Sequence, residues 1–160
     1  MRHGWTVERL VVVGSALSVL ALTTLNIARA EHKHKLPPGP IHDRHELMEG
    51  IGKNAKAIGD AMKAGNLGPV PAAADKIHAD AAKITGLFPP GSTHPNSRAK
   101  AEIWANWDKF QADAKDLEKT SGALAAAAKS GGDVPAAAKT MFGSCKACHD
   151  QFRTPEKDKD

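Results

Sequence analysis

Apolar residues beyond position 40 recur at alternating steps of three and four in four separate segments. The repeating positions are Met48, Ile51, Ala55, Ile58 and Met62; Val70, Ala74, Ile77, Ala81, Ile84 and Phe88; Ile103, Trp107, Phe110, Ala114, Leu117, Ser121, Leu124 and Ala128; and Val134, Ala138, Met141, Cys145, Cys148 and Phe152. This alternation is typical of helices that bury one stripe against nearly parallel neighbours. The pattern therefore predicts four amphipathic helices.

Turn-forming residues separate these four segments. Gly and Pro cluster at residues 65–69, three prolines fall within residues 86–96, and Gly131-Gly132 precedes Asp133, a good helix N-cap. Each connection is short enough to join antiparallel neighbours. We expect an all-α protein with an antiparallel up-down-up-down four-helix bundle.

Composition supports a helical protein and predicts a thin core. The chain has no Tyr, and the only valines beyond residue 30 are Val70 and Val134, whereas alanine supplies 24 of residues 31–160. Strands favour the β-branched and aromatic residues that are scarce here. Alanine buries little area, so we expect the bundle to need a cofactor to complete its core.

The first 30 residues resemble an export signal. Arg2 and Arg9 precede an uncharged apolar run over residues 10–25, and residues 28–30 form an A-x-A cleavage site. Sixteen helical residues span about 24 Å, less than the roughly 30 Å hydrocarbon core, which favours cleavage over a lasting membrane anchor. We therefore predict a signal peptide at 1–30, a polar leader at 31–40 and a functional domain at 41–160.

The charge balance excludes one large class of function. The chain has 22 basic and 18 acidic residues, and residues 31–160 hold 19 and 17 of them. Proteins that bind nucleic acid by neutralising phosphates need a massed positive surface. We expect no nucleic-acid partner.

Both cysteines fall in one pentapeptide, Cys145-Lys146-Ala147-Cys148-His149. C-x-x-C-H is the attachment signature of c-type haem. Two thiols one helical turn apart can bond the two vinyl groups of one haem, and the adjacent imidazole can reach the iron. We expect one haem c, held by Cys145 and Cys148, with His149 as proximal ligand.

Three other uses of this motif have less support. A thioredoxin-like dithiol belongs beside a βαβ unit, for which this chain has no strands. A zinc site needs a fourth ligand that no second cysteine pair supplies. A structural disulfide would leave His149 without a role.

At these residues the chain resembles the class II cytochromes c, which include cytochrome c' and its low-spin relatives, and it is most like the cytochrome c-556 type. The matching stretches are residues 44–65, residues 102–110 (EIWANWDKF) and residues 142–153 (FGSCKACHDQFR). The resemblance implies a four-helix bundle with the haem motif near the C-terminus. It also implies a periplasmic protein of a Gram-negative-type bacterium, and class II relatives are often homodimers.

Met48 is the candidate for the second axial ligand. In the expected topology the first and last helices are neighbours, and Met48 and His149 lie about 25 and 21 Å from the same end of the bundle. A Met on an apolar stripe is commonly core filler. The resemblance favours ligation, because family members carry Arg-x-x-x before the residue over the distal haem face, as Arg44 precedes Met48. His42 and His45 are rival ligands.

Several other residues receive roles of lower specificity. The resemblance implies that Arg153 and Arg44 meet haem propionates, although solvated arginines fit the sequence as well. We expect two tryptophans to line the core or the haem pocket, two phenylalanines to line the haem pocket, and the remaining histidines of the mature chain to be exposed. These residues are Trp104, Trp107, Phe142 and Phe152, and His32, His34, His78 and His94.

These features predict a non-enzymatic, one-electron carrier that exchanges electrons with periplasmic redox proteins. With His149 and Met48 both on the iron, no coordination position is open to a substrate. The main alternative is a five-coordinate haem protein that binds or senses nitric oxide or carbon monoxide. A binding module merely stabilised by haem is a third reading.

Overall fold

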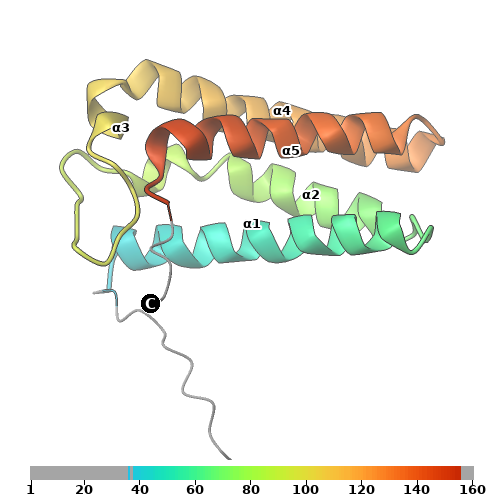
Figure 1. Ribbon diagram of the computed structural model, residues 1–160, viewed down its shortest axis with the longest axis horizontal. Coiled ribbons are helices and arrows are strands. Elements are labelled where there is room, and N and C mark those ends of the chain that lie inside the picture. The colour runs from blue at the N-terminus through green and yellow to red at the C-terminus, as the bar shows by residue number, and fades with distance from the viewer. Residues whose placement is uncertain (1–35, 37, 156–160) are drawn as a thin grey trace, which may run out of the picture. The chain divides into compact units, whose positions relative to one another are not determined.

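The structure is a computed structural model that describes residue 36 and residues 38–155 of the 160-residue chain (Figure 1). The expected signal peptide at 1–30 lies outside the described residues, as do His32 and His34.

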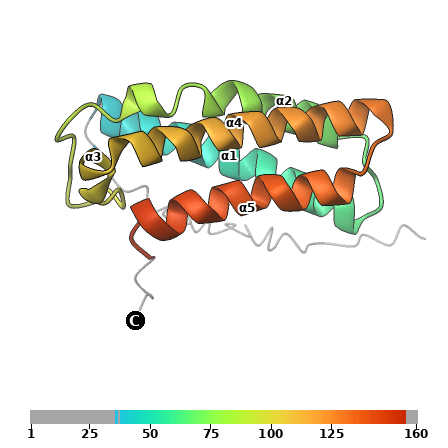
Figure 2. The same ribbon diagram turned by 90° about the horizontal axis from the view of Figure 1, so that it is seen from above.

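Four long helices make up the bundle, and successive ones run in opposite directions (Figures 1 and 2). They are α1 (Pro40–Lys63), α2 (Val70–Ala81), α4 (Trp107–Ser130) and α5 (Val134–Phe152). Two short pieces, η1 (Thr85–Leu87) and α3 (Glu102–Ala105), lie between α2 and α4. The described residues contain no β-strand, and only Ala99 and Arg153 form an isolated bridge. The predicted all-α, up-down-up-down bundle is confirmed.

Helix ends follow the turn residues of the sequence. α4 ends at Gly131, whose φ of 74° is left-handed and whose N–H donates to the Ala127 carbonyl. α5 begins after Asp133, whose carboxylate accepts from the Ala136 N–H at 2.9 Å. Local sequence therefore fixes where the haem-motif helix starts.

The apolar stripes form the core as predicted. Every repeating position of the four segments is buried or half-buried, and Ile58, Ile77, Leu124 and Met141 are among the largest side chains without exposed surface. The buried positions on α2 include Ala73, Ala74 and Ala81. Small side chains there allow close approach of the helices but contribute little buried area each.

Two predicted helices are shorter than their stripes. The third segment breaks at Asn106 (φ −125°, ψ 45°), whose backbone N–H and side-chain amide both donate to the Glu102 carbonyl. Asn competes for backbone hydrogen bonds in this way, so it closes α3 before α4 begins. α2 ends at Ala81, yet Ile84 and Phe88, the residues on either side of η1, continue the stripe into the core.

The four long helices do not pack with equal closeness. α2 packs against α1 and α4, and α4 packs against α5, whereas α1 and α5 approach each other closely at only a few points. Figure 2 shows α5 alongside α4. α1 and α5 are therefore less closely packed against each other than the other neighbouring pairs of long helices.

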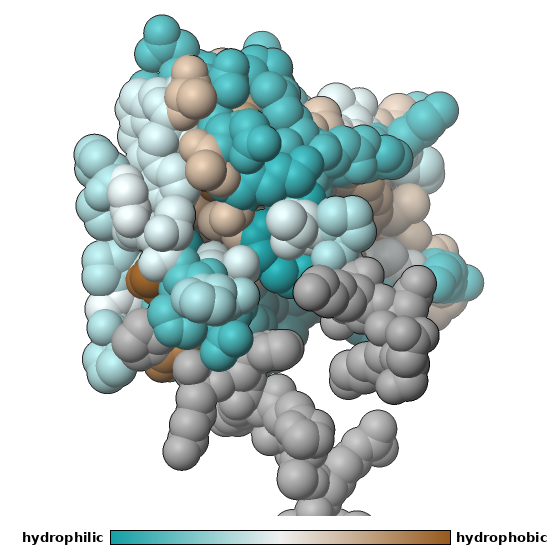
Figure 3. Space-filling view, turned by 60° about the vertical axis from the view of Figure 1, so that its left-hand side comes forward, coloured by the Kyte–Doolittle hydropathy of each residue, from teal (hydrophilic) through white to brown (hydrophobic). Residues whose placement is uncertain are grey.

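The outer surface is predominantly polar on the face drawn in Figure 3, where hydrophobic side chains form small patches. Leu67 is the one large hydrophobic residue classed as exposed within the described part of the chain. None of the described helices combines the length and the apolar character needed to cross a membrane.

Candidate functional site

A pocket between α1, α4 and α5 collects the predicted chemistry. Its walls come from α1, from the turn after α2, from α4 and from α5: Met48 and Ile51; Ile84; Asp113, Ala114 and Leu117; and Ser144, Cys145, Cys148 and His149. Its cavity volume is about 30 Å³, and its mouth opens to solvent. The lining is mainly apolar.

The two cysteines lie in this pocket as free, half-buried thiols. Burial raises the pKa of Cys145, and burial together with the Asp113 carboxylate raises the pKa of Cys148 to about 11. Neutral thiols can occupy an apolar wall without the cost of a buried charge. The helical spacing of the motif thus places both sulfurs at one pocket.

Ser144 ties the motif helix to α4. Its hydroxyl donates to Asp116 Oδ2 at 2.5 Å and lies 3.2 Å from the Thr120 hydroxyl. Ser144 and Thr120 are both buried. These hydrogen bonds fix the rotation of α5 beside the cysteines, because buried polar groups must keep their partners.

His149 lines both the pocket and a neighbouring surface groove. Although the residue is exposed as a whole, its ring is partly covered, and this burial lowers the pKa of the imidazole, with smaller contributions from Arg153 and Arg98. The neutral imidazole is the form that binds a metal ion.

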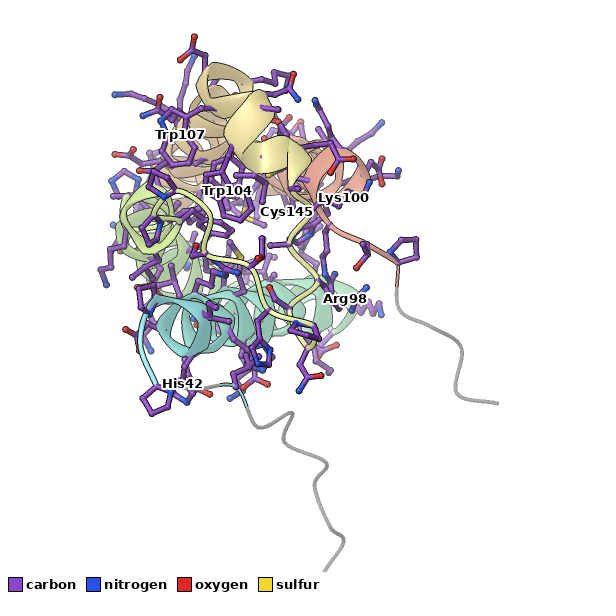
Figure 4. The ribbon with its side chains drawn as sticks, turned by 90° about the vertical axis from the view of Figure 1, so that its left-hand side faces the viewer. His42, Arg98, Lys100, Trp104, Trp107 and Cys145 are labelled. Atoms are coloured by element: carbon purple, nitrogen blue, oxygen red, sulfur yellow. The ribbon has the colours of Figure 1, made fainter. Side chains whose placement is uncertain are left out.

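Met48 is brought to the same pocket from α1, where it is half-buried. Neither rival ligand, His42 or His45, lines this pocket. His45 Nε2 lies 3.4 Å from Glu49 Oε1, and His42 lies 3.6 Å from Asp43, each beside an acidic residue of α1. Figure 4 shows His42 at the outer side of α1, away from Cys145.

Arg44 does not line the pocket and is directed at the loop that follows η1. The residue is 4% exposed, and its guanidinium donates to the Ser92 hydroxyl and carbonyl at 2.8 Å and to the Ser97 hydroxyl at 3.0 Å. It also lies 4.7 Å from the centre of the Phe88 ring. This placement differs from the expected propionate contact, because loop groups far along the chain satisfy the guanidinium.

Arg153 lies beside His149 in the surface groove. Arg98 and Lys100 line the same groove, together with Asp150, Thr154 and Pro155. Backbone hydrogen bonds from Lys100 to Phe152 and from Thr154 to Arg98 hold the loop against the end of α5. The groove therefore carries several basic side chains next to the imidazole (Figure 4 labels Arg98 and Lys100).

The aromatic residues form a cluster near the pocket instead of lining it. Phe110 makes ring contacts with Phe88 at 4.7 Å, with Phe152 at 5.4 Å and with Trp107 at 5.5 Å. The Trp104 indole donates to the carbonyls of Phe88 and Pro89. Phe142 packs against the core. Neither Phe142 nor Phe152 lines the pocket, contrary to our expectation from the sequence.

Two further histidines have backbone partners. His78 is exposed, and its Nδ1 lies 2.8 Å from the Glu118 carbonyl, to which it donates. Nδ1 of the half-buried His94 accepts from the Asn96 N–H at 3.1 Å. Both hydrogen bonds are local or between helices, and neither ring lines the pocket.

Sequence reasoning missed Asp113 and Ser144 as pocket residues. Each directly precedes a position of an apolar stripe, Ala114 or Cys145, and neither received a role from the sequence. A residue next to a buried stripe lies at the edge of the same helix face, and this position in the sequence could have identified both residues.

The residues of this pocket fit a covalently attached haem. Two free thiols and one imidazole border a mainly apolar space on the side of the bundle where α1 and α5 pack least closely. Cysteine and histidine side chains are the groups by which c-type haem is held. A planar apolar group attached there would add buried apolar area that the alanine-rich helices lack.

Known proteins resemble this chain over nearly the whole bundle. A family described as Cytochrome C' matches residues 39–153. The cytochrome c' of Rhodospirillum rubrum is 30% identical over 152 residues, which cover 91% of this chain and 98% of that protein. Cytochrome c-556 of Agrobacterium tumefaciens is 32% identical over 119 residues, or 72% of this chain and 97% of that one.

Solved structures give the same picture. The crystal structure of cytochrome c' from Thermochromatium tepidum superposes with a TM-score of 0.67 at 29% identity, over 72% of this chain and 95% of that one. The sequence match extends from the start of α1 to the end of α5.

Proposed function

This chain belongs to the cytochrome c' family, whose members carry covalent haem c, and we propose that it is a one-electron carrier rather than an enzyme. The observation that carries the proposal is that Met48 and His149 line one pocket, next to Cys145 and Cys148. Two side-chain donors of this kind suit an iron that exchanges electrons and takes no substrate.

We assign each residue of the pocket a role. Cys145 and Cys148 hold the haem through thioether bonds, and His149 is the proximal ligand. The bound haem supplies an iron that gains or loses one electron. The neutral state that burial favours for the His149 ring keeps its donor nitrogen available.

Met48 is the proposed distal ligand. Its thioether is a soft donor, and on α1 it lines the same pocket as the α5 motif. Arg153, in the groove beside His149, is the proposed partner of a haem propionate. We no longer favour that role for Arg44, because its guanidinium is engaged by Ser92 and Ser97.

A gas-binding role is the alternative, and the family match supports it too. The relatives named above include proteins called cytochrome c' as well as cytochrome c-556. Only the Met48 side chain separates the two roles in our proposal, since without it the distal position would be open to nitric oxide or carbon monoxide.

We propose a periplasmic location and redox-protein partners. Residues 1–30 carry the features of a cleaved signal peptide, which would release the domain at 41–160 outside the cytoplasm. Contacts between electron carriers are typically small and brief. A homodimer remains a prediction, which the sedimentation of the mature protein would test.

The visible spectrum of the mature, haem-loaded protein tests the proposal. We expect a low-spin ferric spectrum with the long-wavelength band of methionine–iron ligation, and a ferrous spectrum that carbon monoxide does not change. A high-spin spectrum that shifts with carbon monoxide would replace the electron carrier by the gas binder. Absence of covalently bound haem would reject both.

A further inference from the structure

Asp113 places a mostly buried carboxylate in the wall of the haem pocket. It projects from α4 into the space bordered by Cys148 and His149, and its side chain is 12% exposed. Oδ1 forms an ion pair with the Lys109 ammonium of the preceding turn. Oδ2 is buried and accepts no hydrogen bond.

Bundle stability does not account for this carboxylate. A buried acceptor without a donor costs folding free energy, and an apolar residue at this position would avoid the cost. Asp116, on the same helix, shows the contrast, because its Oδ2 accepts the Ser144 hydroxyl. The neighbours of Asp113 in the pocket include Ile51, Ala114 and Leu117, which offer no donor.

The charge of Asp113 reaches Cys148 on the neighbouring helix α5. After burial, the Asp113 carboxylate is the largest influence that raises the pKa of the Cys148 thiol, and Lys109 acts on it in the opposite direction. Charges interact more strongly across a water-poor pocket than in solvent. Asp113 and Lys109 thus form a pair whose two members act with opposite sign on whatever occupies the pocket.

We propose that the Asp113 carboxylate lowers the reduction potential of the iron held by His149, and that Lys109 moderates this effect. The inference rests on the proposed haem attachment and holds with or without Met48 as ligand. Reduction adds one electron to the iron and no proton, so a fixed negative charge nearby favours the ferric over the ferrous form. Asp113 thus acts on the reduction potential through its charge, without contacting the iron.

Redox titration of the haem-loaded protein tests the proposal. With Asp113→Asn we expect the ferrous-to-ferric ratio at a fixed applied potential to rise roughly three- to tenfold, as expected for a partly neutralised charge in a pocket; tenfold corresponds to about 59 mV for one electron. Asp108→Asn is the matched control, because it removes the same charge from an exposed position of α4 outside the pocket. An Asp113→Asn shift no larger than that of the control would overturn the proposal.

Two further variants separate charge from structure. Lys109→Gln changes a half-exposed side chain and should shift the ratio in the opposite direction, toward ferric. Asp113→Glu keeps the charge and should keep the potential near that of the unchanged protein. Shifts of the same sign for Asp113→Asn and Lys109→Gln would contradict the electrostatic origin. If the Asp113→Asn protein does not accumulate, the Lys109→Gln shift tests the proposal: a shift toward ferric supports it and a shift toward ferrous overturns it.

The failure of this inference is distinguishable from failure of the proposed function. The ferric and ferrous spectra report haem attachment and ligation, while the titration reports the potential. Unchanged spectra with a shifted potential support the role of Asp113. A potential shift accompanied by a change of ligation in the spectra would overturn it, because the ligands and not the charge would then account for the shift.

Discussion

Met48 on α1 and His149 on α5 line the same pocket, although they come from opposite ends of the bundle sequence. The antiparallel order of the helices makes this meeting possible, because the beginning of α1 and the end of α5 lie at one end of the bundle. Any group attached at the α5 motif therefore has Met48 within its surroundings.

Replacing Met48 by Ala should open the distal position of the iron. We expect the ferric spectrum to change from low-spin to high-spin and the ferrous protein to bind carbon monoxide, since no rival donor lines the pocket from α1. Met62→Ala is the matched control, because Met62 is also half-buried on α1 but does not line the pocket. A low-spin Met48→Ala protein that ignores carbon monoxide would show that another side chain is the ligand.

Replacing Arg44 by Ala should destabilise the bundle without changing the spectrum. The change removes three hydrogen bonds to Ser92 and Ser97 and the contact with the Phe88 ring. Unsatisfied groups left in the loop should lower the free energy of unfolding by about 2–3 kcal/mol, measured by urea denaturation of the haem-loaded protein. A shifted reduction potential with unchanged stability would instead favour the propionate contact.

Asp133→Ala should weaken the start of the motif helix. The Asp133 carboxylate caps α5 by accepting from the Ala136 N–H. Losing such a cap costs about 1 kcal/mol, to be read from thermal or urea unfolding. Asp133→Asn keeps an accepting oxygen and should stay close to the parent protein, and equal losses for both variants would contradict the capping role.

The double variant Cys145→Ala/Cys148→Ala should lack covalent haem and fold poorly. The pocket between α1 and α5 would lose the apolar group that we expect to fill it, and the alanine-rich stripes offer little area in exchange. Circular dichroism should show reduced helicity and a broad, weakly cooperative melt. A fully helical, cooperatively melting variant would refute the prediction.

Much of the fold follows from local patterns in the chain. The stripe from Val134 to Phe152 contains enough information to predict both the helix and its buried face, because helical periodicity depends only on spacing. Gly131 likewise predicts the end of α4, and Asp133 predicts the start of α5. The break at Asn106 escaped this reasoning, since the apolar stripe continues across it and only the competition of an Asn side chain for backbone groups interrupts the helix.

The candidate site shows the same difference between what local sequence predicts and what helix packing decides. Spacing alone predicted the use of Cys145, Cys148 and His149, because two thiols and an imidazole on adjacent turns of a helix can serve one haem. The arrangement of other groups around them depended on how the helices pack. The resemblance predicts that Arg44, four residues before Met48, meets a haem propionate. Its guanidinium instead donates to Ser92, in a loop about fifty residues away along the chain.

The sequence by itself therefore determined the helices, their buried faces and the haem-binding motif, since these depend on residues within a few turns of one another. Only the tertiary structure decided which groups from different helices share the pocket. Asp113 shows the physical reason: its Oδ2 is left without a donor where α4 packs against α5, and a carboxylate's surroundings are set by packing across helices. No pattern along a single helix contains that information.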